Sequence, residues 1–441
     1  MNSINSFSSA LCKSYNVYIS WLFISTLTLF VGCGDSNPAP IEDSSSDRVE
    51  DKSQELIPEN SLEKAKPDDQ LDRLSLANSR LAESEASEGW IKLFDGVTLF
   101  GWETDGKANF RVEDGLLVVD EGEMSLLCTS MKWDSYELLV EYRADSEVNS
   151  GIFLNTDLVP GDVATECYEI NIAPSSHPFS TGSLVNREAA SNVPAASGDN
   201  WRTLKISHRS GELSINLDGV DVCNYEDPNP PSPGKIGLQH NSGRIEFRRV
   251  MLRPLDLKSM LDSDLVLWKQ YPDMDAKYSV TESGWMRVQG GSGQIETSEQ
   301  YDDFVLLAEY KLPTPEMNSG IFFRCIPGDK MMGYECQVSN FGSDEDPLVP
   351  ADCGTGGIFR RQDARFIAGD NEKWVTVVLQ ARGPSMSAWV NGVQVSDWTD
   401  TREKNENPRR GSRLEAGTIM VQGHDPKTDA LFKQFKIRSV N

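Results

Sequence analysis

Histidine is scarce in this chain of 441 residues, which contains only four. A metal centre built from many histidines is therefore excluded, and each His can be considered singly. The chain also contains no Cys-x-x-Cys pair, no Gly-x-Gly-x-x-Gly segment and no P-loop, so the common sequence signals for structural zinc and bound nucleotides are missing. No Ser lies in the Gly-x-Ser-x-Gly context of an α/β-hydrolase nucleophile.

Basic residues are also few, since 42 Lys and Arg face 68 Asp and Glu and give a formal net charge of −26. Such a charge repels phosphate backbones and anionic lipid heads, so nucleic acid is not expected as a partner. Hydrophobic residues make up 38%, but ten Trp, eleven Tyr and seventeen Phe are enough for real cores and exclude global disorder. At roughly 150 residues per domain, the length predicts more than one domain.

A single long apolar run occurs in the chain, at residues 17–31 (VYISWLFISTLTLFV). This run predicts a signal peptide over residues 1–32. The segment that follows, Phe30-Val31-Gly32-Cys33, resembles the lipobox of bacterial lipoproteins and implies that Cys33 is lipidated. Because Phe30 stands where Leu is usual, a retained transmembrane anchor stays open. Both readings place the rest of the chain outside the cytoplasm, and the lipid would anchor it to the envelope membrane, in the periplasm or at the outer membrane.

Residues 33–88 are expected to form a disordered acidic linker. From Gly34 to Gly89 there are 15 acidic and 6 basic side chains and no aromatic residue. Such a segment cannot bury enough apolar surface to offset its ordering entropy. Only residues 71–81 have helical spacing, which indicates a transient helix.

Six cysteines remain after removal of the signal peptide and lipidation of Cys33. Cys325 and Cys336 flank a short connection and are expected on the same face of neighbouring strands, which favours a disulfide between them. The alternative is that all six are buried, small apolar side chains.

The chain contains one fold written twice. Residues 136–153 (YELLVEYRADSEVNSGIF) match residues 304–322 (FVLLAEYKLPTPEMNSGIF). Further landmarks recur in the same order: Tyr168-Glu169 as Tyr334-Glu335, Thr181-Gly182 as Thr355-Gly356, Trp201 as Trp374, Asp218-Gly219 as Asn391-Gly392, and Gln239-His240 as Gln422-Gly423-His424. The two copies are expected at residues 89–256 and 264–441.

Within each copy the hydrophobic period is two. In residues 136–142, Tyr136, Leu138, Val140 and Tyr142 alternate with side chains that face the other way. Asp-Gly and Asn-Gly pairs supply two-residue hairpin turns, and no long amphipathic helix is visible. An all-β chain of two tandem antiparallel β-sandwiches is therefore predicted.

The same landmarks resemble the bacterial 3-keto-disaccharide hydrolase family of concanavalin-like jelly rolls. The resemblance is carried by residues 90–96 (WIKLFDG), residues 111–117 (RVEDGLL), both Asn-Ser-Gly-Ile-Phe motifs and residues 334–337 (YECQ). It spans nearly all of residues 89–441, and it implies two tandem jelly rolls.

The resemblance also implies hydrolysis of a glycoside whose C3 hydroxyl has been oxidised to a ketone. The ketone acidifies the C2 hydrogen, so a base can remove that proton, an electrophile can hold the enolate oxygen, and the group at C1 can leave before water adds. The substrate is then an oxidised carbohydrate. No cofactor is certain; a divalent metal ion at the enolate oxygen stays open.

Strand parity selects the candidate catalytic residues in the second copy. In residues 334–338, Tyr334, Cys336 and Val338 point to the core, which leaves Glu335 and Gln337 on the opposite face. The same logic is expected to bring Glu309 and Arg324 to that face, with Arg360 and His424 at later strand ends. The predicted catalytic residues are Glu335, Glu309, Arg324 and His424, and the predicted substrate-binding residues are Asn318, Gln337 and Arg360.

The first copy keeps Glu141, Asn149, Glu169 and His240, which are candidate substrate-binding residues together with Asn171. It has Asn155 where the second copy has Arg324, so the second copy is expected to be the catalyst. Alternatives stay open for these residues: solvated surface pairs for the charged ones, a turn or bulge role for the Asn-Ser-Gly motif, and a turn role for His424. For the whole chain, a non-catalytic carbohydrate-binding lipoprotein is the alternative function, and an envelope scaffold is a third.

Overall fold

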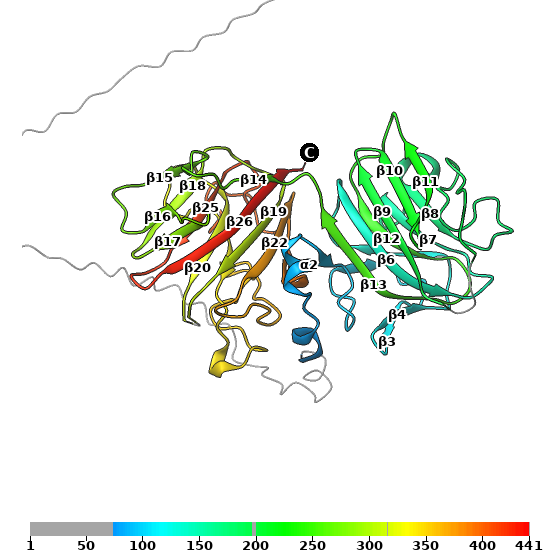
Figure 1. Ribbon diagram of the computed structural model, residues 1–441, viewed down its shortest axis with the longest axis horizontal. Helices are drawn as coiled ribbons and strands as arrows, with labels where there is room; N and C mark the ends of the chain where they lie inside the picture. The colour runs from blue at the N-terminus through cyan, green and yellow to red at the C-terminus, as the bar shows by residue number, and fades with distance from the viewer. Residues whose placement is uncertain (1–73, 196–199, 315, 441) are drawn as a thin grey trace, which may run out of the picture. The chain divides into compact units, whose positions relative to one another are not determined.

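The structure is a computed structural model that describes residues 74–195, 200–314 and 316–440. The predicted signal peptide, the lipidation site Cys33 and residues 33–73 of the linker lie outside the described residues. The described chain is almost entirely β, in two sandwiches that each pair an eight-stranded with a five-stranded antiparallel sheet (Figure 1). The prediction of two tandem β-sandwiches is confirmed.

The first sandwich runs from β1 to β13 along the chain. Its eight-stranded sheet has the spatial order β11 (Val220–Glu226), β10 (Glu212–Leu217), β9 (Arg202–Arg209), β6 (Tyr136–Ala144), β13 (Ile245–Pro254), β4 (Leu116–Val119) and β3 (Arg111–Glu113), and β1 (Ile91–Lys92) pairs with β13. Its five-stranded sheet has the order β2 (Trp102–Thr104), β5 (Ser125–Thr129), β12 (Lys235–His240), β7 (Ser150–Thr156) and β8 (Tyr168–Ile172). A short helix, α3 (Val163–Glu166), connects β7 to β8.

The second sandwich repeats this layout from β14 to β26. Its eight-stranded sheet has the order β16 (Lys277–Val280), β17 (Met286–Gln289), β26 (Asp429–Ser439), β19 (Phe304–Lys311), β22 (Val375–Arg382), β23 (Ser385–Val390) and β24 (Val393–Thr399), and β14 (Lys258–Ser259) pairs with β26. Its five-stranded sheet has the order β15 (Trp268–Gln270), β18 (Gly293–Thr297), β25 (Thr418–Gly423), β20 (Ser319–Cys325) and β21 (Tyr334–Val338). A 3₁₀ turn, η1 (Ser343–Glu345), follows β21.

Alternation along the strands builds each core. In β6 the side chains of Tyr136, Leu138, Val140 and Tyr142 are buried, while those between them are half-buried. In the second sandwich, Tyr334, Cys336 and Val338 of β21 lie in the hydrophobic core, as their parity predicts. Glu335 and Gln337 therefore project from the outer face of the five-stranded sheet.

The last part of the predicted linker is folded, so the expectation of disorder up to residue 88 is wrong for residues 74–88. Residues 74–78 are helical, and α2 (Glu83–Ser87) buries Ala86. Leu76 and Ala77 lie in the core cluster of the second sandwich, and Arg80 forms an ion pair with Asp370 at 2.9 Å. Leu76 and Ala77 thus have a partner surface that composition alone does not reveal. No helix in the described part of the chain is long and apolar enough to cross a membrane.

The six cysteines of the two sandwiches are all free and buried. The predicted disulfide between Cys325 and Cys336 is wrong, because the two side chains belong to different layers. Cys336 lies in the core, whereas Cys325 packs outside it with Phe322, Met331 and Met420. A β-bulge between Phe322 and Cys325 shifts the register and reverses the parity on which the prediction depended.

Candidate functional site

A cavity of about 430 Å³ lies on the outer face of the five-stranded sheet in the second sandwich. Strands β20, β21 and β25 supply its floor, and the loops that contain residues 352–361 and 408–409 supply its walls. Its lining residues are Asn318, Phe322, Met331, Gly333, Tyr334, Glu335, Gln337, Asp352, Phe359, Arg360, Arg361, Pro408, Arg409, Gln422 and His424. The volume suits one or two sugar rings.

Glu335 on β21 is one of the lining residues. In the pairing of β20 with β21, Glu335 lies opposite Phe322, and Gly320 lies opposite Gln337, two residues away along each strand. A Cβ atom added at Gly320 would lie 2.5 Å from Oε1 of Glu335 and 2.9 Å from Cε2 of Phe322. The Gly of the repeated Asn-Ser-Gly motif therefore leaves room for the carboxyl group to lie across the neighbouring strand.

For any reaction that uses the Glu335 carboxyl group, replacing Gly320 with Ala is expected to lower kcat by at least about tenfold, because a displacement of about 1 Å at a reacting group can cost up to 10²-fold. Some loss of stability is also expected, since the added Cβ would lie 2.9 Å from Cε2 of the buried Phe322 ring. The matched control is Gly151→Ala in the first sandwich, where the added Cβ would lie 3.1 Å from Oε1 of Glu169. Steady-state kinetics and thermal unfolding of both variants check this. Equal turnover in wild type and Gly320→Ala would contradict it.

Burial raises the pKa of the Glu335 carboxyl to about 7. The cause is mainly desolvation, with a smaller contribution from the negative charge of Asp352, and Arg409 and Arg360 oppose it. Among the described residues, no hydrogen bond or ion pair engages this carboxyl group. A carboxylate with a pKa near neutrality and free oxygens has the properties of a general base.

Amide groups surround Glu335 and hold the loop that contains Asp352. Asn318 donates from Nδ2 to Oδ2 of Asp352 at 2.6 Å, and Gln337 donates from Nε2 to the Asp352 carbonyl oxygen at 2.9 Å. Within the described part of the chain, Oδ1 of Asn318 and Oε1 of Gln422 are buried without a hydrogen-bond partner. Two buried acceptors at the cavity wall are suited to the hydroxyl donors of a sugar.

The Ser of the same motif has a structural role. Ser319 donates from Oγ to the carbonyl oxygen of Gln422 at 2.8 Å, and Ser150 makes the matching bond to Gln239 at 2.7 Å. The motif therefore ties two strands of each five-stranded sheet together while Asn318 faces the cavity.

Arg360 and His424, both predicted from the sequence, lie at the rim. Arg360 has a φ of 58° and places its guanidinium 5.3 Å from the centre of the Phe359 ring. His424 is exposed, and its Nδ1 lies 2.9 Å from Oδ2 of Asp425. Both side chains can reach a ligand in the cavity from solvent.

Three further residues line the cavity and were not predicted from the sequence: Arg361, Arg409 and Asp352. They come from loops, where strand parity gives no direction. A cluster of basic residues at 409–410 in a strongly acidic chain was the available signal.

Glu309 is not part of the cavity, so the prediction that it converges with Glu335 is wrong. It lies on β19 in the eight-stranded sheet and is fully buried. Its Oε2 accepts from Nε2 of Gln434 at 2.8 Å, and its Oε1 pairs with Nζ of Lys433 at 2.7 Å. Parity gave the correct face of the strand, but it cannot tell which of the two sheets the strand joins.

Arg324 is also turned away from the cavity, and the prediction that it joins Glu335 is wrong. The bulge in β20 gives it a φ of 49°, and its side chain is fully buried. The guanidinium donates from Nε to the Asp302 carbonyl oxygen at 2.8 Å and from Nη2 to Oδ1 of Asp303 at 2.9 Å. It therefore ties the bulge to the loop that precedes β19.

In the first sandwich, Glu141 behaves as Glu309 does. It lies on β6 of the eight-stranded sheet and forms ion pairs with Arg248 at 2.6 Å and Arg249 at 3.3 Å. It is separate from the candidate residues of the five-stranded sheet.

The other candidates of the first sandwich, Asn149, Glu169, Asn171 and His240, lie on or beside β7, β8 and β12 of the five-stranded sheet. Burial raises the pKa of Glu169 to about 7, as for its counterpart Glu335. Asn171 donates from Nδ2 to the carbonyl oxygen of Phe179. His240 is buried with a lowered pKa caused by desolvation. The first sandwich thus has a partly buried carboxyl group, that of Glu169, at the position of Glu335. Its Asn171 side chain binds the loop that contains Phe179.

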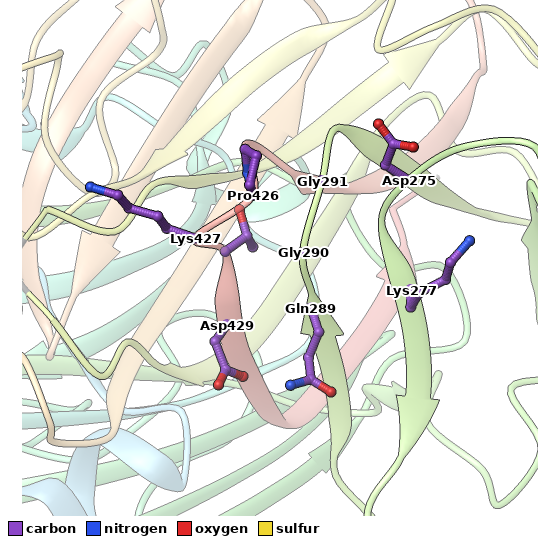
Figure 2. A pocket seen from close by; sticks show the side chains of 9 residues that line it. Asp275, Lys277, Gln289, Gly290, Gly291, Pro426, Lys427 and Asp429 are labelled. Carbon is purple, nitrogen blue, oxygen red and sulfur yellow. The ribbon is translucent and has the colours of Figure 1, made fainter.

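A second hollow, about 770 Å³ and widely open, lies where β16 and β17 meet the turn between β25 and β26. Figure 2 shows Gln289 and Asp429 side by side, with Lys277 and Lys427 extending away from them. Asp429 is occupied by Arg287, which donates to both of its carboxylate oxygens at 2.8 Å. The residues that line this hollow include no aromatic side chain and no buried carboxyl group. The candidate functional site is therefore the cavity that contains Glu335.

No group of three or more His, Cys, Asp or Glu side chains that could hold a metal ion occurs among residues 74–195, 200–314 and 316–440. The donors gathered at the cavity are instead carboxyl, amide and guanidinium groups.

The described chain thus consists of two jelly-roll sandwiches, and the second has a polar cavity of about 430 Å³ on its smaller sheet. The family model described as the 3-keto-alpha-glucoside-1,2-lyase-like domain matches residues 89–253 and again residues 256–438. The chain therefore belongs to this family, with two tandem copies of its domain. A search of curated proteins found no significant match.

Solved structures share the fold at low sequence identity. A candidate glycosyl hydrolase from Parabacteroides distasonis ATCC 8503 is 18% identical, with 40% of this chain and 98% of that chain covered and a TM-score of 0.36. A second candidate glycosyl hydrolase from the same organism is 20% identical, with 42% and 100% covered and a TM-score of 0.33. The carbohydrate-binding module CBM66 from Bacillus subtilis is 15% identical, with 39% and 96% covered and a TM-score of 0.29.

Proposed function

We propose that the second sandwich cleaves 3-keto-glycosides by elimination and hydration, with Glu335 as the general base. The family supports the reaction class, and the position of the unpaired Glu335 carboxyl in a cavity lined by arginine side chains is the observation that carries the assignment. A carboxylate of ordinary pKa would be a weaker base for the C2 proton of a keto sugar.

In the proposed reaction, the Glu335 carboxylate takes the C2 proton and the electron pair of that C–H bond forms an enolate with the C3 carbonyl. Arg360 stabilises the negative charge on the C3 oxygen. The enolate then re-forms the ketone, a C1–C2 double bond is made, and the C1–O bond breaks with its electron pair on the leaving oxygen, which takes up the proton held by Glu335. Water adds its oxygen to C1 and a proton to C2 and gives the free 3-keto sugar.

The remaining cavity residues position the sugar. The unpartnered acceptors Asn318 Oδ1 and Gln422 Oε1 would accept from its hydroxyl groups, and the Phe322 and Phe359 rings would contact its apolar faces. Arg324, the predicted reason for placing catalysis in the second sandwich, is not at the cavity. The proposal depends instead on Arg360, where the first sandwich has Asn186 at the same strained backbone position, with φ values of 58° and 60°.

Turnover of a 3-keto-disaccharide in D₂O tests this proposal. The released keto sugar is expected to carry deuterium at C2, and the unoxidised disaccharide is expected to remain intact. Because Glu335 must be ionised to act, kcat/KM is expected to fall about tenfold per pH unit below its pKa of about 7 and to level off above it. Cleavage of the keto sugar without deuterium at C2 would sink the elimination mechanism, and a profile flat from pH 5 to 8 would remove Glu335 as the base.

We propose further that Cys33 carries a lipid and holds the protein on the outer side of a bacterial membrane. The apolar run before it supports this proposal. A Cys33→Ala variant is expected to appear in the soluble envelope fraction, whereas retention in the membrane would indicate an uncleaved transmembrane anchor.

A further inference from the structure

The cavity of the second sandwich carries an excess of positive charge in a strongly acidic chain. Arg360, Arg361 and Arg409 line it together with only two carboxyl groups, those of Glu335 and Asp352. Among the described residues, none of these three guanidinium groups forms an ion pair with a carboxylate. Arg361 donates hydrogen bonds to the backbone carbonyl oxygens of residues 360 and 409, and Arg409 donates one to the backbone carbonyl oxygen of residue 331.

The charge balance is positive even with both carboxyl groups ionised. With the pKa of Glu335 raised to about 7, its charge is partly absent at neutral pH, and the excess is then larger. The chain as a whole has a formal charge of −26. A local reversal of sign inside a concave, partly desolvated wall is the arrangement that attracts an anionic ligand.

Comparison of the two sandwiches shows how Arg361 loses its carboxylate partner. Its counterpart in the first sandwich, Arg187, forms an ion pair with Asp227 at 2.7 Å. The counterpart of Asp227 is Asp400, since Tyr168 donates to Asp227 and Tyr334 donates to Asp400.

Asp400 is occupied by a different arginine. Arg402 donates to both of its carboxylate oxygens, at 2.9 Å and 2.8 Å. The first sandwich has Asn229 at that position, where only the backbone N–H reaches Asp227. The exchange of Asn229 for Arg402 thus leaves Arg361 without a carboxylate.

The other two cations also come from differences between the copies. Arg360 replaces Asn186, and Arg409 lies in an enlarged loop. Asp400 and Gly417 are separated by 17 positions, whereas the matching Asp227 and Gly234 are separated by seven. Arg360 and Arg409 therefore have no arginine counterpart in the first sandwich, and Arg361 differs from its counterpart Arg187 in having no carboxylate partner in the described part of the chain.

We propose that this cavity takes acidic sugars, that is, glycosides with a carboxylate or sulfate group close to the reacting ring. The inference rests on the proposed function, because it names the substrate class for the same cavity. Arg409 and Arg361 bind the acidic group, while Arg360 stays with the reacting ring. Planar guanidinium groups match the two oxygens of a carboxylate or sulfate and give charge-assisted hydrogen bonds.

Binding of unoxidised sugars tests the substrate class independently of turnover. Calorimetry on the whole protein compares its affinity for the methyl glycosides of glucuronic acid, glucose 6-sulfate and glucose. The acidic sugars are expected to bind at least about tenfold more tightly than methyl glucoside. This preference should shrink at an ionic strength of about 1 M, where the Debye length is about 3 Å.

Arg409→Gln is the main variant, because its side chain is exposed and its loss should not unfold the sandwich. It is expected to lose most of the preference for acidic sugars, because its affinity for the two acidic glycosides falls far more than its affinity for methyl glucoside. Arg410→Gln is the matched control, since Arg410 is the exposed neighbour in the same loop and does not line the cavity. Thermal unfolding of both variants shows whether the loop remains folded.

The outcomes separate this inference from the proposed function. Equal affinity for acidic and neutral sugars, or an equal loss in Arg410→Gln, overturns the inference even if neutral 3-keto-glycosides are cleaved. A preference for acidic sugars that depends on Arg409, with no cleavage of any 3-keto-glycoside, supports acidic-sugar binding and overturns the lyase proposal. If only the glucuronide binds more tightly than methyl glucoside, the cavity recognises a carboxylate group. If only the 6-sulfate binds more tightly, it recognises a sulfate group.

Discussion

Replacing Glu335 with Gln is expected to lower kcat for a 3-keto-disaccharide by about 10² to 10⁴-fold, the usual loss when a general base is removed. Gln keeps the shape of the side chain, so the cavity and the contact with Gly320 are retained. The variant removes only the capacity to accept the C2 proton. Initial rates under saturating substrate measure the change, and exchange of the C2 hydrogen with D₂O should fall in parallel.

The stability of the same variant provides a second readout with a defined sign. The pKa of Glu335 is raised from 4.5 to about 7 in the folded protein, so the folded state binds the proton more tightly than the unfolded chain does. The stability contributed by this group is present below pH 4.5 and is lost as the pH rises through 7. Wild type and Glu335→Gln should therefore differ little in acid, and the variant should gain stability relative to wild type above pH 7.

Glu169→Gln in the first sandwich is the matched control for Glu335→Gln. Both carboxyl groups lie on the strand that follows the Asn-Ser-Gly motif, and burial raises the pKa of both to about 7. Only Glu335 has an arginine-lined cavity around it in the described chain. A large loss of turnover in Glu169→Gln, with little change in Glu335→Gln, would move catalysis to the first sandwich.

The fold could be predicted because its signals are local and repeated. Alternation over an uninterrupted strand such as β21 fixes which side chains face the core, and two copies of each landmark show that the pattern is not accidental. The folded segment at residues 74–88 could not be predicted in the same way. Its apolar residues are too few to fold alone, and their burial depends on a partner surface far along the chain.

The candidate site could be predicted in part, up to the point where parity applies. Glu335, Gln337 and Asn318 were found because they lie on or next to a regular strand. Arg324 was misplaced because a bulge reverses its side chain, and Glu309 was misplaced because parity does not identify the sheet.

The arginines that line the cavity from loops, Arg361 and Arg409, could not be predicted from strand parity, since their positions depend on tertiary contacts. Among the residues that the structure describes, Arg361 has no carboxylate partner, whereas Arg402 donates to both carboxylate oxygens of Asp400. A residue-by-residue comparison of the two copies would have shown the exchange of Asn229 for Arg402, but not its consequence for Arg361.

Arg324→Asn is expected to destabilise the second sandwich by about 3 kcal/mol without a specific effect on catalysis. Removing one member of a buried ion pair leaves its partners unsatisfied, which typically costs 3 to 5 kcal/mol; Asp303 retains 29% exposure, so the lower end applies. Asn is the natural residue at the matching bulge, where Asn155 has a φ of 56° against 49° for Arg324. The substitution therefore keeps a residue type suited to the backbone and removes the guanidinium alone.

Denaturant unfolding of Arg324→Asn measures this loss, and Arg287→Ala is its control. Arg287 pairs with Asp429 through two bonds of 2.8 Å at the surface, where both side chains are more than a third exposed. Its removal should cost less than about 1 kcal/mol. Because the Arg324 side chain ends at Asp302 and Asp303 rather than at the cavity, kcat per folded molecule should match wild type at a temperature where Arg324→Asn is fully folded. A large fall in kcat with unchanged unfolding would mean that this guanidinium reaches the substrate, and would restore the role that strand parity first gave it.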